Sequence, residues 1–355
     1  MNSGSPTPVP TPPAGFRAEL NDAVSLRGVL MVLAVLAVQL GFILSYVGAF
    51  HSPRPHGISV AVVAPRPQRL ADRLNALPGD PLHARVATGE SQARRMILRR
   101  SVDSALVINP RGTTDLLLVA SAGGPAVSAT AAQIAGKVET VQRRNLRIED
   151  IRPPSAKDGR SLSSFYTALG WVVGGYLAAA ILGMSAGARP ATFNRTLIRM
   201  GVLTSYAVLS GLGGAVIVDP ALGALPGHFF ALWGIGALVV LAAGASTAFF
   251  QILLGPMGIG LTILLFVVLG NPSAGGPYPA ALLPPFWRAI GPWLPPGAAT
   301  SAIRNTVYFA GNATTMPLLV LVAYAVGGVV LSLLASAVRL RRARTPAGPS
   351  TTAAR

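Results

Sequence analysis

The residues of this chain that could form a nucleotide-binding P-loop do not have the spacing that such a loop needs. Its single Gly-Lys pair is Gly136-Lys137. A phosphate-binding P-loop requires a glycine five residues before that glycine and a serine or threonine directly after the lysine. The chain has Ala131 and Val138 at these two positions. The sequence therefore excludes nucleotide binding through a P-loop.

The residues that could bind a metal ion or act as nucleophiles are few and scattered. The chain has no cysteine, which excludes disulfides and thiolate chemistry. Its histidines do not have metal-ligand spacing relative to one another, and they are His51, His56, His83 and His228. We therefore expect no enzymatic activity, no bound metal and no resident cofactor.

Two glycine patterns lie inside strongly apolar runs. One is Gly170-x-x-x-Gly174, and the other is "GLGGA", which contains Gly211 and Gly214. Small residues at such spacings let two helices in a membrane approach each other closely. We predict helix packing at these four glycines in preference to phosphate or ligand binding.

These patterns lie within six apolar blocks that contain no Asp, Glu, Lys or Arg. A helix needs about 20 apolar residues to cross a bilayer. Charged residues make up only 12% of the chain and the mean hydropathy is +0.54, unlike a soluble domain. We predict a polytopic α-helical membrane protein with six transmembrane helices, in the blocks Gly28–Phe50, Phe165–Gly187, Met200–Val218, Phe229–Leu254, Pro256–Gly270 and Pro317–Val338. The fifth block is the shortest, and Gly255-Pro256 is the natural break before it.

The net charge of +17 is concentrated outside these blocks. Seventeen of the 29 Lys and Arg residues lie in 51–161 among nine acidic residues, and five lie in 339–355. No aromatic-basic recognition motif accompanies them. We expect no nucleic-acid partner. The charges are typical of the loops and tails of a membrane protein.

The distribution of arginine in short loops predicts the orientation. Loop 188–199 carries three arginines and no acid, and the C-terminal tail carries Arg339, Arg341, Arg342 and Arg344. Loop 219–228 carries no Lys or Arg. Positive loops remain on the cytoplasmic side. With six spans, both termini are then cytoplasmic in the plasma membrane, and residues 51–161 and 271–316 are extracytoplasmic.

Residues 51–161 have the pattern of a small α/β domain. Strand-like runs such as "GISVAVVAP" alternate with helical runs such as "PQRLADRLNALPG", and "RGT" separates two strands as a hairpin would. The predicted order is β-α-β-α-β-β-α-β, with the helices on one face of the sheet. Such a domain would dock a partner or face a substrate, or it would serve as a rigid spacer.

Residues 271–316 combine many helix breakers with very few charges. Leu269–Asn305 holds eight prolines, two tryptophans and two arginines as its only charges. Tryptophan is typical of the headgroup region, and irregular backbone is allowed there when protein covers it. We predict short amphipathic pieces, broken at Pro284-Pro285, Pro292 and Pro295-Pro296, that form a re-entrant or interfacial lid on the outer face. The alternative is an outer surface loop without a role in transport.

The same segment resembles the region before the last span of phage infection protein (YhgE/Pip)-like membrane proteins, which are related to ABC-2 type transporter permeases. The resemblance rests on "NPSAGG" and on "LLPPFWRAIGPWLPPGAATSAIRNTVYF", over roughly 40 residues. It makes this segment a candidate site, whose residues are Asn271, Pro272, Gly275, Gly276, Trp287, Arg288, Trp293, Pro295, Gly297 and Arg304. The resemblance extends to the order of one span, an outer domain and five further spans, although many members have a much longer outer region.

The resemblance implies a permease subunit without its own ATPase. Two copies would form the pathway as a homodimer, and a separate cytoplasmic ATP-binding cassette subunit would supply energy. Residues 15–28 would be an interfacial helix before the first span, which ends at residue 50. The loop Gly187–Arg199 would be gripped by the ATPase through Arg189, Asn194, Arg195 and Arg199, or it would act only as a positive anchor. Residues 1–14 and residues 339–355 are predicted to be tails. The five spans that follow the outer domain are predicted to form a membrane domain over residues 162–338.

The expected function is export of a lipidic or amphipathic cargo, with membrane lipids as partners. One alternative is a membrane scaffold or surface receptor in envelope assembly or secretion. Another is an ion-coupled transporter, which usually keeps ionisable residues within its spans. The six blocks contain no acidic or basic side chain of that kind, and this argues against ion coupling.

Overall fold

The computed structural model describes residues 26–185, 187–190 and 192–344. The chain divides into two compact units, residues 1–44 and 45–355, and helix α2 (Leu26–Phe50) runs across the boundary. The predicted tail 1–14, most of the predicted interfacial segment 15–28 and residues 345–355 lie outside the described part. The predicted C-terminal tail begins as helix, because α13 (Thr315–Arg344) continues through its first six residues.

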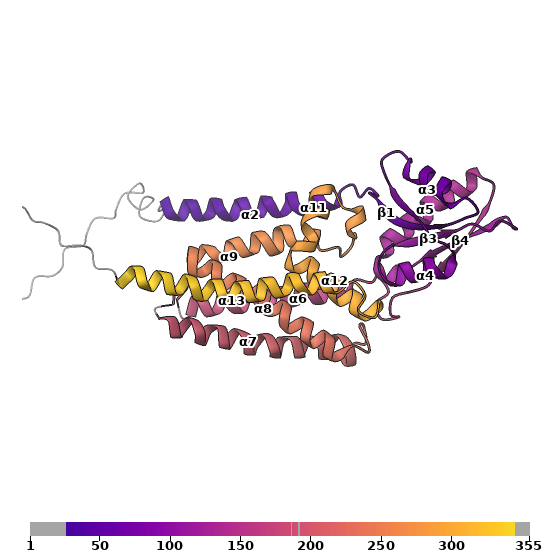
Figure 1. Ribbon diagram of the computed structural model, residues 1–355. Coiled ribbons are helices and arrows are strands. Elements are labelled where there is room, and N and C mark those ends of the chain that lie inside the picture. Colours follow the sequence, from indigo (N-terminus) through magenta and orange to yellow (C-terminus); the bar gives the residue numbers. More distant parts are fainter. Residues whose placement is uncertain (1–25, 186, 191, 345–355) are drawn as a thin grey trace, which may run out of the picture. The chain divides into compact units, whose positions relative to one another are not determined.

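Five helices of the described chain are long and apolar enough to cross a membrane. They are α2, α6 (Ser163–Ser185), α7 (Phe193–Val216, extended by the π-helical turn η2, Ile217–Ala221), α8 (Phe229–Leu254) and α13. Figure 1 shows α6, α7, α8 and α13 side by side. This confirms a multi-pass helical architecture for five of the six predicted blocks.

The block Pro256–Gly270 is shorter than the other five, as the sequence predicts, and its crossing of the membrane stays a prediction. Residues 257–270 lie within Met257–Ser273, a shorter apolar helix of roughly 25 Å at 1.5 Å per residue, against a hydrocarbon core of about 30 Å. It consists of α9 (Met257–Thr262), the π-helical η3 (Ile263–Leu269) and α10 (Gly270–Ser273). The predicted break before it is confirmed, because α8 ends at Leu254 and Gly255 has φ +65°.

Helix α8 is the centre of the helical bundle, and glycines on its neighbours let their backbones reach it. A Cβ added to Gly175 of α6 would lie 2.4 Å from the Val240 carbonyl oxygen of α8. A Cβ added to Gly211 of α7 would lie 2.5 Å from the Ala237 nitrogen of α8. A Cβ added to Gly328 of α13 would lie 2.7 Å from the Ala245 carbonyl carbon of α8. No side chain fits at these distances. Contact between small residues therefore holds three helices against the fourth.

The other predicted packing glycines differ from Gly211. Gly214 faces the Trp171 ring, where an added Cβ would lie 2.3 Å from the indole nitrogen. Gly174 lies near the Tyr206 hydroxyl, with 3.2 Å to an added Cβ. Within the described chain, an added Cβ at Gly170 would meet no heavy atom within 4 Å. The packing role expected for Gly170 is therefore wrong, and this glycine lines an open groove between α6 and α7.

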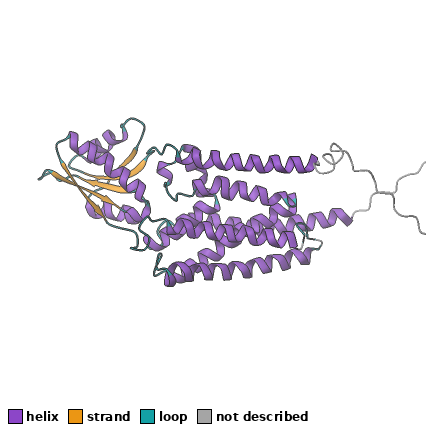
Figure 2. Cartoon of the chain, turned by 180° about the vertical axis from the view of Figure 1, so that it is seen from behind, coloured by secondary structure: helices purple, strands orange, loops and turns teal. Residues whose placement is uncertain are grey.

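The α/β domain between α2 and α6 has the predicted order of elements, and Figure 2 shows its strands in orange with helices beside them. The elements are β1 (Ile58–Val63), α3 (Pro67–Asn75), β2 (Leu82–Val86), α4 (Glu90–Leu98), β3 (Ser104–Val107), β4 (Thr114–Val119), α5 (Pro125–Val141) and β5 (Asn145–Asp150). The strands form one sheet in the order β2-β1-β3-β4-β5. The predicted hairpin is confirmed, since β3 and β4 pair antiparallel while the other pairs are parallel.

The prediction that helices cover one face of this sheet is wrong. Val60 and Val62 pack with α3 and α5, whereas Ala61 between them packs with α4. Parallel crossover connections are almost always right-handed. The chain moves one way from β1 to β2 and the opposite way from β2 to β3, so α3 and α4 must cover opposite faces. Helix α5 returns to the face of α3 because β4 runs in the reverse direction.

A buried pair of carboxylates lies inside this domain. Arg144 donates to Asp115 from Nη2 over 2.6 Å, and its Nε lies 3.8 Å from a carboxylate oxygen of Glu139 on α5. Both acidic side chains are buried. Burial, together with a hydrogen bond to Asp115 and its charge, raises the pKa of Glu139 to about 7. Glu139 therefore holds a proton in the folded domain at pH values where a free glutamate is ionised.

We expect the stability of this domain to fall as the pH rises from 4.5 toward about 7. In that range the folded state binds more protons at Glu139 than the unfolded chain does. Hydrogen exchange of the α5 amides in the full-length protein, converted to a free energy of opening, measures this slope. Glu139→Gln should flatten it, while the same substitution at the exposed Glu90 should not. An equal slope in the wild type and Glu139→Gln would contradict the assignment.

Candidate functional site

The segment 271–316 forms short helical pieces, two of which begin at the predicted proline pairs. After α10 come the 3-10 turn Ala280–Leu282, α11 (Pro285–Ile290), the 3-10 turn Gly291–Trp293 and α12 (Pro295–Tyr308). Proline is favoured at the first position of a helix, where its missing N–H costs nothing. The proline pairs therefore start α11 and α12 instead of merely interrupting a loop.

Helix α12 does not lie on the surface as a lid would. Eleven of its 14 residues are buried, and it packs against α6, α8 and α13. Its first turn is made of proline, glycine and alanine, and an added Cβ at Gly297 would lie 2.1 Å from the Gly291 carbonyl oxygen. The interfacial alternative is therefore wrong for α12, while the re-entrant alternative stays a prediction. An interfacial position fits α11 better, since α11 has no fully buried residue.

The C-terminal half of α12 carries a charged group into this interior. Arg304 is 5% exposed and donates from Nη2 to the Gly275 carbonyl over 3.1 Å. Its Nε has no hydrogen-bond partner within the described residues. A buried guanidinium is costly unless it is paired. The contact with Gly275 therefore ties α12 to the chain that enters the segment from α10.

One turn later, Tyr308 joins α12 to the chain that leaves the α/β domain. Its hydroxyl donates to Oδ2 of Asp158 over 2.6 Å. The other oxygen of Asp158 accepts from the Ser163 N–H, at the start of α6, over 2.9 Å. Asp158 is 4% exposed. Both of its oxygens are thus satisfied, and the carboxylate connects α12 directly to α6.

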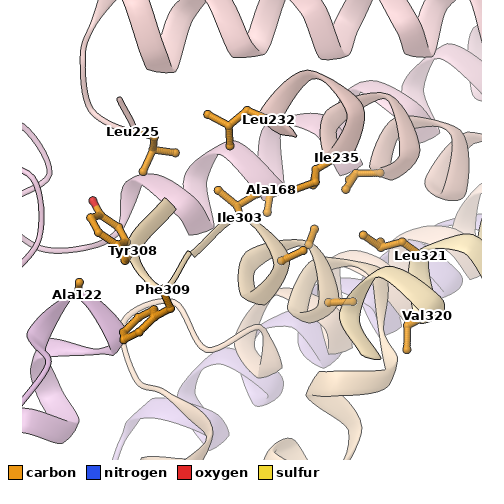
Figure 3. Close-up of a cluster of buried hydrophobic side chains, with 14 of the residues drawn as sticks. Ala122, Ala168, Leu225, Leu232, Ile235, Ile303, Tyr308, Phe309, Val320 and Leu321 are labelled. Atoms are coloured by element: carbon orange, nitrogen blue, oxygen red, sulfur yellow. The ribbon is translucent and has the colours of Figure 1, made fainter. Parts of the chain in front are cut away.

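The α/β domain itself contacts the same end of α12. Figure 3 shows Ala122 beside Phe309, in one buried apolar cluster with Tyr308. The Arg100 guanidinium lies 4.6 Å from the centre of the Phe309 ring, a cation–π contact. Ser161 donates to the Ala122 carbonyl over 2.8 Å. We call Arg100, Asp158, Arg304, Tyr308 and Phe309 the junction.

The structure brings some of the predicted residues of this segment together and separates others. Buried around α12 are Asn271, Pro272, Gly275, Gly276, Pro295, Gly297 and Arg304. Trp287 and Arg288 are half-buried on α11, where Arg288 donates to the His56 carbonyl over 3.0 Å. Trp293 is 59% exposed. The two tryptophans are therefore not among the buried residues around α12.

Sequence reasoning missed Asp158 and Arg100, the members of the junction from the α/β side. Both lie among many charged residues of that domain, and no local pattern distinguishes them. Tyr308 and Phe309 were part of the family resemblance, although no contact could be assigned to them. Only the fold places residues separated by 150 positions within hydrogen-bond distance.

The predicted cytoplasmic loop is shorter than expected, because α7 begins at Phe193. The Thr192 hydroxyl caps this helix by accepting from the Arg195 N–H over 3.2 Å. Asn194 and Arg195 are exposed on its first turn, and Arg189 is exposed in the preceding turn. Arg199 is 6% exposed. The expectation that Arg199 is available to a partner protein is therefore wrong.

Arginines from three elements converge on the last turn of α8. Arg199 donates from Nη2 to the Gln251 side chain over 2.5 Å and to the Ala179 carbonyl over 3.0 Å. Arg339 donates to the Ile252 carbonyl over 2.8 Å, and Arg189 to the Leu253 carbonyl over 3.4 Å. The last carbonyls of a helix lack partners within the helix and attract cations. Gln251, the only residue with a side-chain amide in Phe229–Leu254, was the overlooked signal for this cluster.

We expect Tyr308→Phe to destabilise the protein by about 1.5–3 kcal/mol, the usual contribution of a hydrogen bond to a charged group. The substitution removes one hydroxyl and leaves a buried oxygen of Asp158 without its donor. Thermal unfolding of the detergent-solubilised protein measures the loss. The matched control is Tyr166→Phe, because Tyr166 is 59% exposed on α6. Equal stability of the two variants would show that the junction does not hold the domains together.

Comparisons of the chain with protein-family models, with curated proteins and with solved structures find no match. The function is therefore argued from the contacts described above.

Proposed function

We propose that the chain is the membrane subunit of an ABC-2-like exporter that moves a lipidic or amphipathic cargo. In this proposal two copies form the pathway, and a separate cytoplasmic ATP-binding cassette subunit supplies the energy. The observation that carries the proposal is the buried helix α12, which lies among the membrane helices and is bonded through Tyr308 to Asp158 at the α/β domain.

The junction supports an even number of membrane crossings between Asp158 and Tyr308. Residues in direct contact lie on the same side of the membrane. Between them the chain passes through α6, α7 and α8, which would leave it on the opposite side. The short helix Met257–Ser273 must then cross as well, as the sixth span. The contact of Asn312 with the Leu98 carbonyl, over 3.2 Å, likewise favours an outer position for the turn before α13.

One contact favours a crossing by this short helix. The Ser45 hydroxyl, near the end of α2, donates to the Val268 carbonyl near the end of the short helix. Helix α13 then ends on the side opposite the α/β domain. The arginines around the end of α8 lie on that same side, which makes it cytoplasmic by the positive-inside rule.

An energy-coupled transporter needs a mechanical connection between its two faces. Here the exposed first turn of α7 leads to Gly211, where α7 touches the backbone of α8. Helix α8 in turn packs against α12, and α12 reaches Asp158. Close-packed interiors transmit strain. A partner that moves Arg195 at one end would thereby displace the junction at the other.

The groove between α6 and α7 suits an amphipathic cargo. It has a volume of about 550 Å³. Apolar side chains make up much of its wall, with a few hydroxyls among them, and its lining includes Tyr166, Gly170, Ser210 and Ile217. The open position at Gly170 keeps the groove wide. An acyl chain would lie along the apolar wall while a polar group reaches the hydroxyls.

A membrane scaffold is the second candidate, and one observation favours it. Strand β5 lies at the edge of the sheet with one side unpaired, and Ile148 on it is 52% exposed. An exposed edge strand is a site at which another chain can add a strand. A partner in envelope assembly would bind here without any need for α12 to move.

We expect the tagged full-length protein, extracted in mild detergent, to retain a stoichiometric soluble ATPase that contains a P-loop. Arg195→Glu should release it, because the substitution reverses a charge on the exposed first turn of α7. Mass spectrometry of the bound proteins gives the measurement. Arg111→Glu, an exposed arginine of the α/β domain, is the matched control and should retain the ATPase.

The opposite result is equally specific. In that result, the protein retains envelope or secretion proteins instead of an ATPase. If Ile148→Asp loses these proteins and Arg195→Glu keeps them, the exporter is rejected and the scaffold is established. Binding of an ATPase that neither arginine variant affects would place the contact elsewhere on the chain.

A further inference from the structure

A pocket of about 410 Å³ lies beside the start of α7, and Arg195 is the one residue of its lining that the proposed function uses. Arg195 and Arg199 supply its charge, and apolar side chains of α6 and α7 supply its wall; the full lining is Leu182, Gly187, Pro190, Arg195, Ile198, Arg199 and Val202. It therefore combines two cations with an apolar surface. The carboxylates of the described chain form no ion pair with either arginine.

Arg199 is the main reason to expect a ligand there. Its side chain is buried, and only Nη2 has hydrogen-bond partners; Nε and Nη1 have none within the described residues. The partners of Nη2 are a carbonyl and an amide, which are neutral. Burying a charge without a counter-charge is expensive. An anion in the pocket would supply the missing counter-charge.

The position of the pocket along the helix identifies the kind of anion. The candidate span Phe193–Ala221 has 29 residues and is about 43 Å long at 1.5 Å per residue, which matches a bilayer with its headgroups. Arg195 and Arg199 lie roughly 3 Å and 9 Å from its start. They therefore lie at the level of the lipid phosphates and the first atoms of the acyl chains.

The apolar wall continues from the arginines toward the bilayer centre. Ile198 is 66% exposed and Val202 is 47% exposed, on a helix that faces hydrocarbon if it spans the membrane. A free phosphate would use the arginines alone. A lipid would use both the arginines and this wall.

We infer that the pocket binds the phosphate group of an anionic phospholipid from the leaflet at this end of the helices. Arg195 and Arg199 hold the phosphate, and an acyl chain lies along Ile198 and Val202. The inference requires only that these helices lie in a membrane. It therefore holds whether the chain exports a cargo or serves as a scaffold.

The test uses the delipidated full-length protein in a neutral detergent. Binding of phosphatidylglycerol is followed by native mass spectrometry and by the rise in melting temperature, in parallel with phosphatidylcholine and with inorganic phosphate. We expect phosphatidylglycerol to bind at least about tenfold more tightly than phosphatidylcholine, and inorganic phosphate to stabilise the protein much less. Arg195→Gln should weaken phosphatidylglycerol binding about tenfold or more, the usual loss for one charge-assisted hydrogen bond.

The controls separate a built site from general charge. Arg189→Gln removes an equal charge at the same end of the helices from a residue outside the pocket, and it should change affinity less than about twofold. Ile198→Trp fills the apolar wall from an exposed position and should abolish binding without unfolding the protein. Because Ile198→Trp leaves the buried Arg199 unchanged, the test does not depend on a folded variant of Arg199.

Three results would overturn the inference. Equal affinity for the two lipids would mean a non-specific lipid shell. Equal weakening by Arg189→Gln and Arg195→Gln would mean attraction to the general positive charge. Full stabilisation by inorganic phosphate, unaffected by Ile198→Trp, would mean a site for free anions instead of lipid.

Discussion

The hydrogen bond from the Tyr308 hydroxyl to the Asp158 carboxylate joins residues that are 150 positions apart. One partner ends the buried helix α12, and the other precedes the first helix after the α/β domain. Because a carboxylate buried in an apolar setting must be satisfied, this contact constrains both segments. The side of the membrane assigned to each segment, the number of crossings between them and the docking of the domain through Arg100 and Phe309 all depend on it.

The opposite end of the helices is organised by a different electrostatic constraint. The last carbonyls of α8 lack partners within the helix, and arginines from the α6–α7 turn and from α13 supply donors. Arg199 has a different position, because it reaches the Gln251 side chain and retains two unpaired nitrogens. The arginines at this end therefore have two roles. Arg189 and Arg339 donate to the last carbonyls of α8, and Arg199 lines a pocket.

Between these two ends, helix packing relies on backbone contact. Gly175, Gly211 and Gly328 each bring a neighbouring helix against α8 at distances that exclude a side chain. Lipid provides little hydrophobic drive for helices to associate, so close packing supplies much of their attraction. The groove at Gly170 and the pocket at Arg199 lie away from these contacts, among side chains that are partly exposed.

The sequence by itself determined which elements form and roughly where they begin and end. Charge-free blocks of bilayer length became helices, proline pairs started α11 and α12, and alternating patterns gave the eight elements of the α/β domain in order. These features depend on local spacing, which the sequence displays directly. Only the tertiary structure decided that α4 lies on the opposite face of the sheet, because the face follows from the strand order. It also decided that α12 is interior and Arg199 buried, since small residues and a single arginine are compatible with either surface or core until their distant neighbours are known.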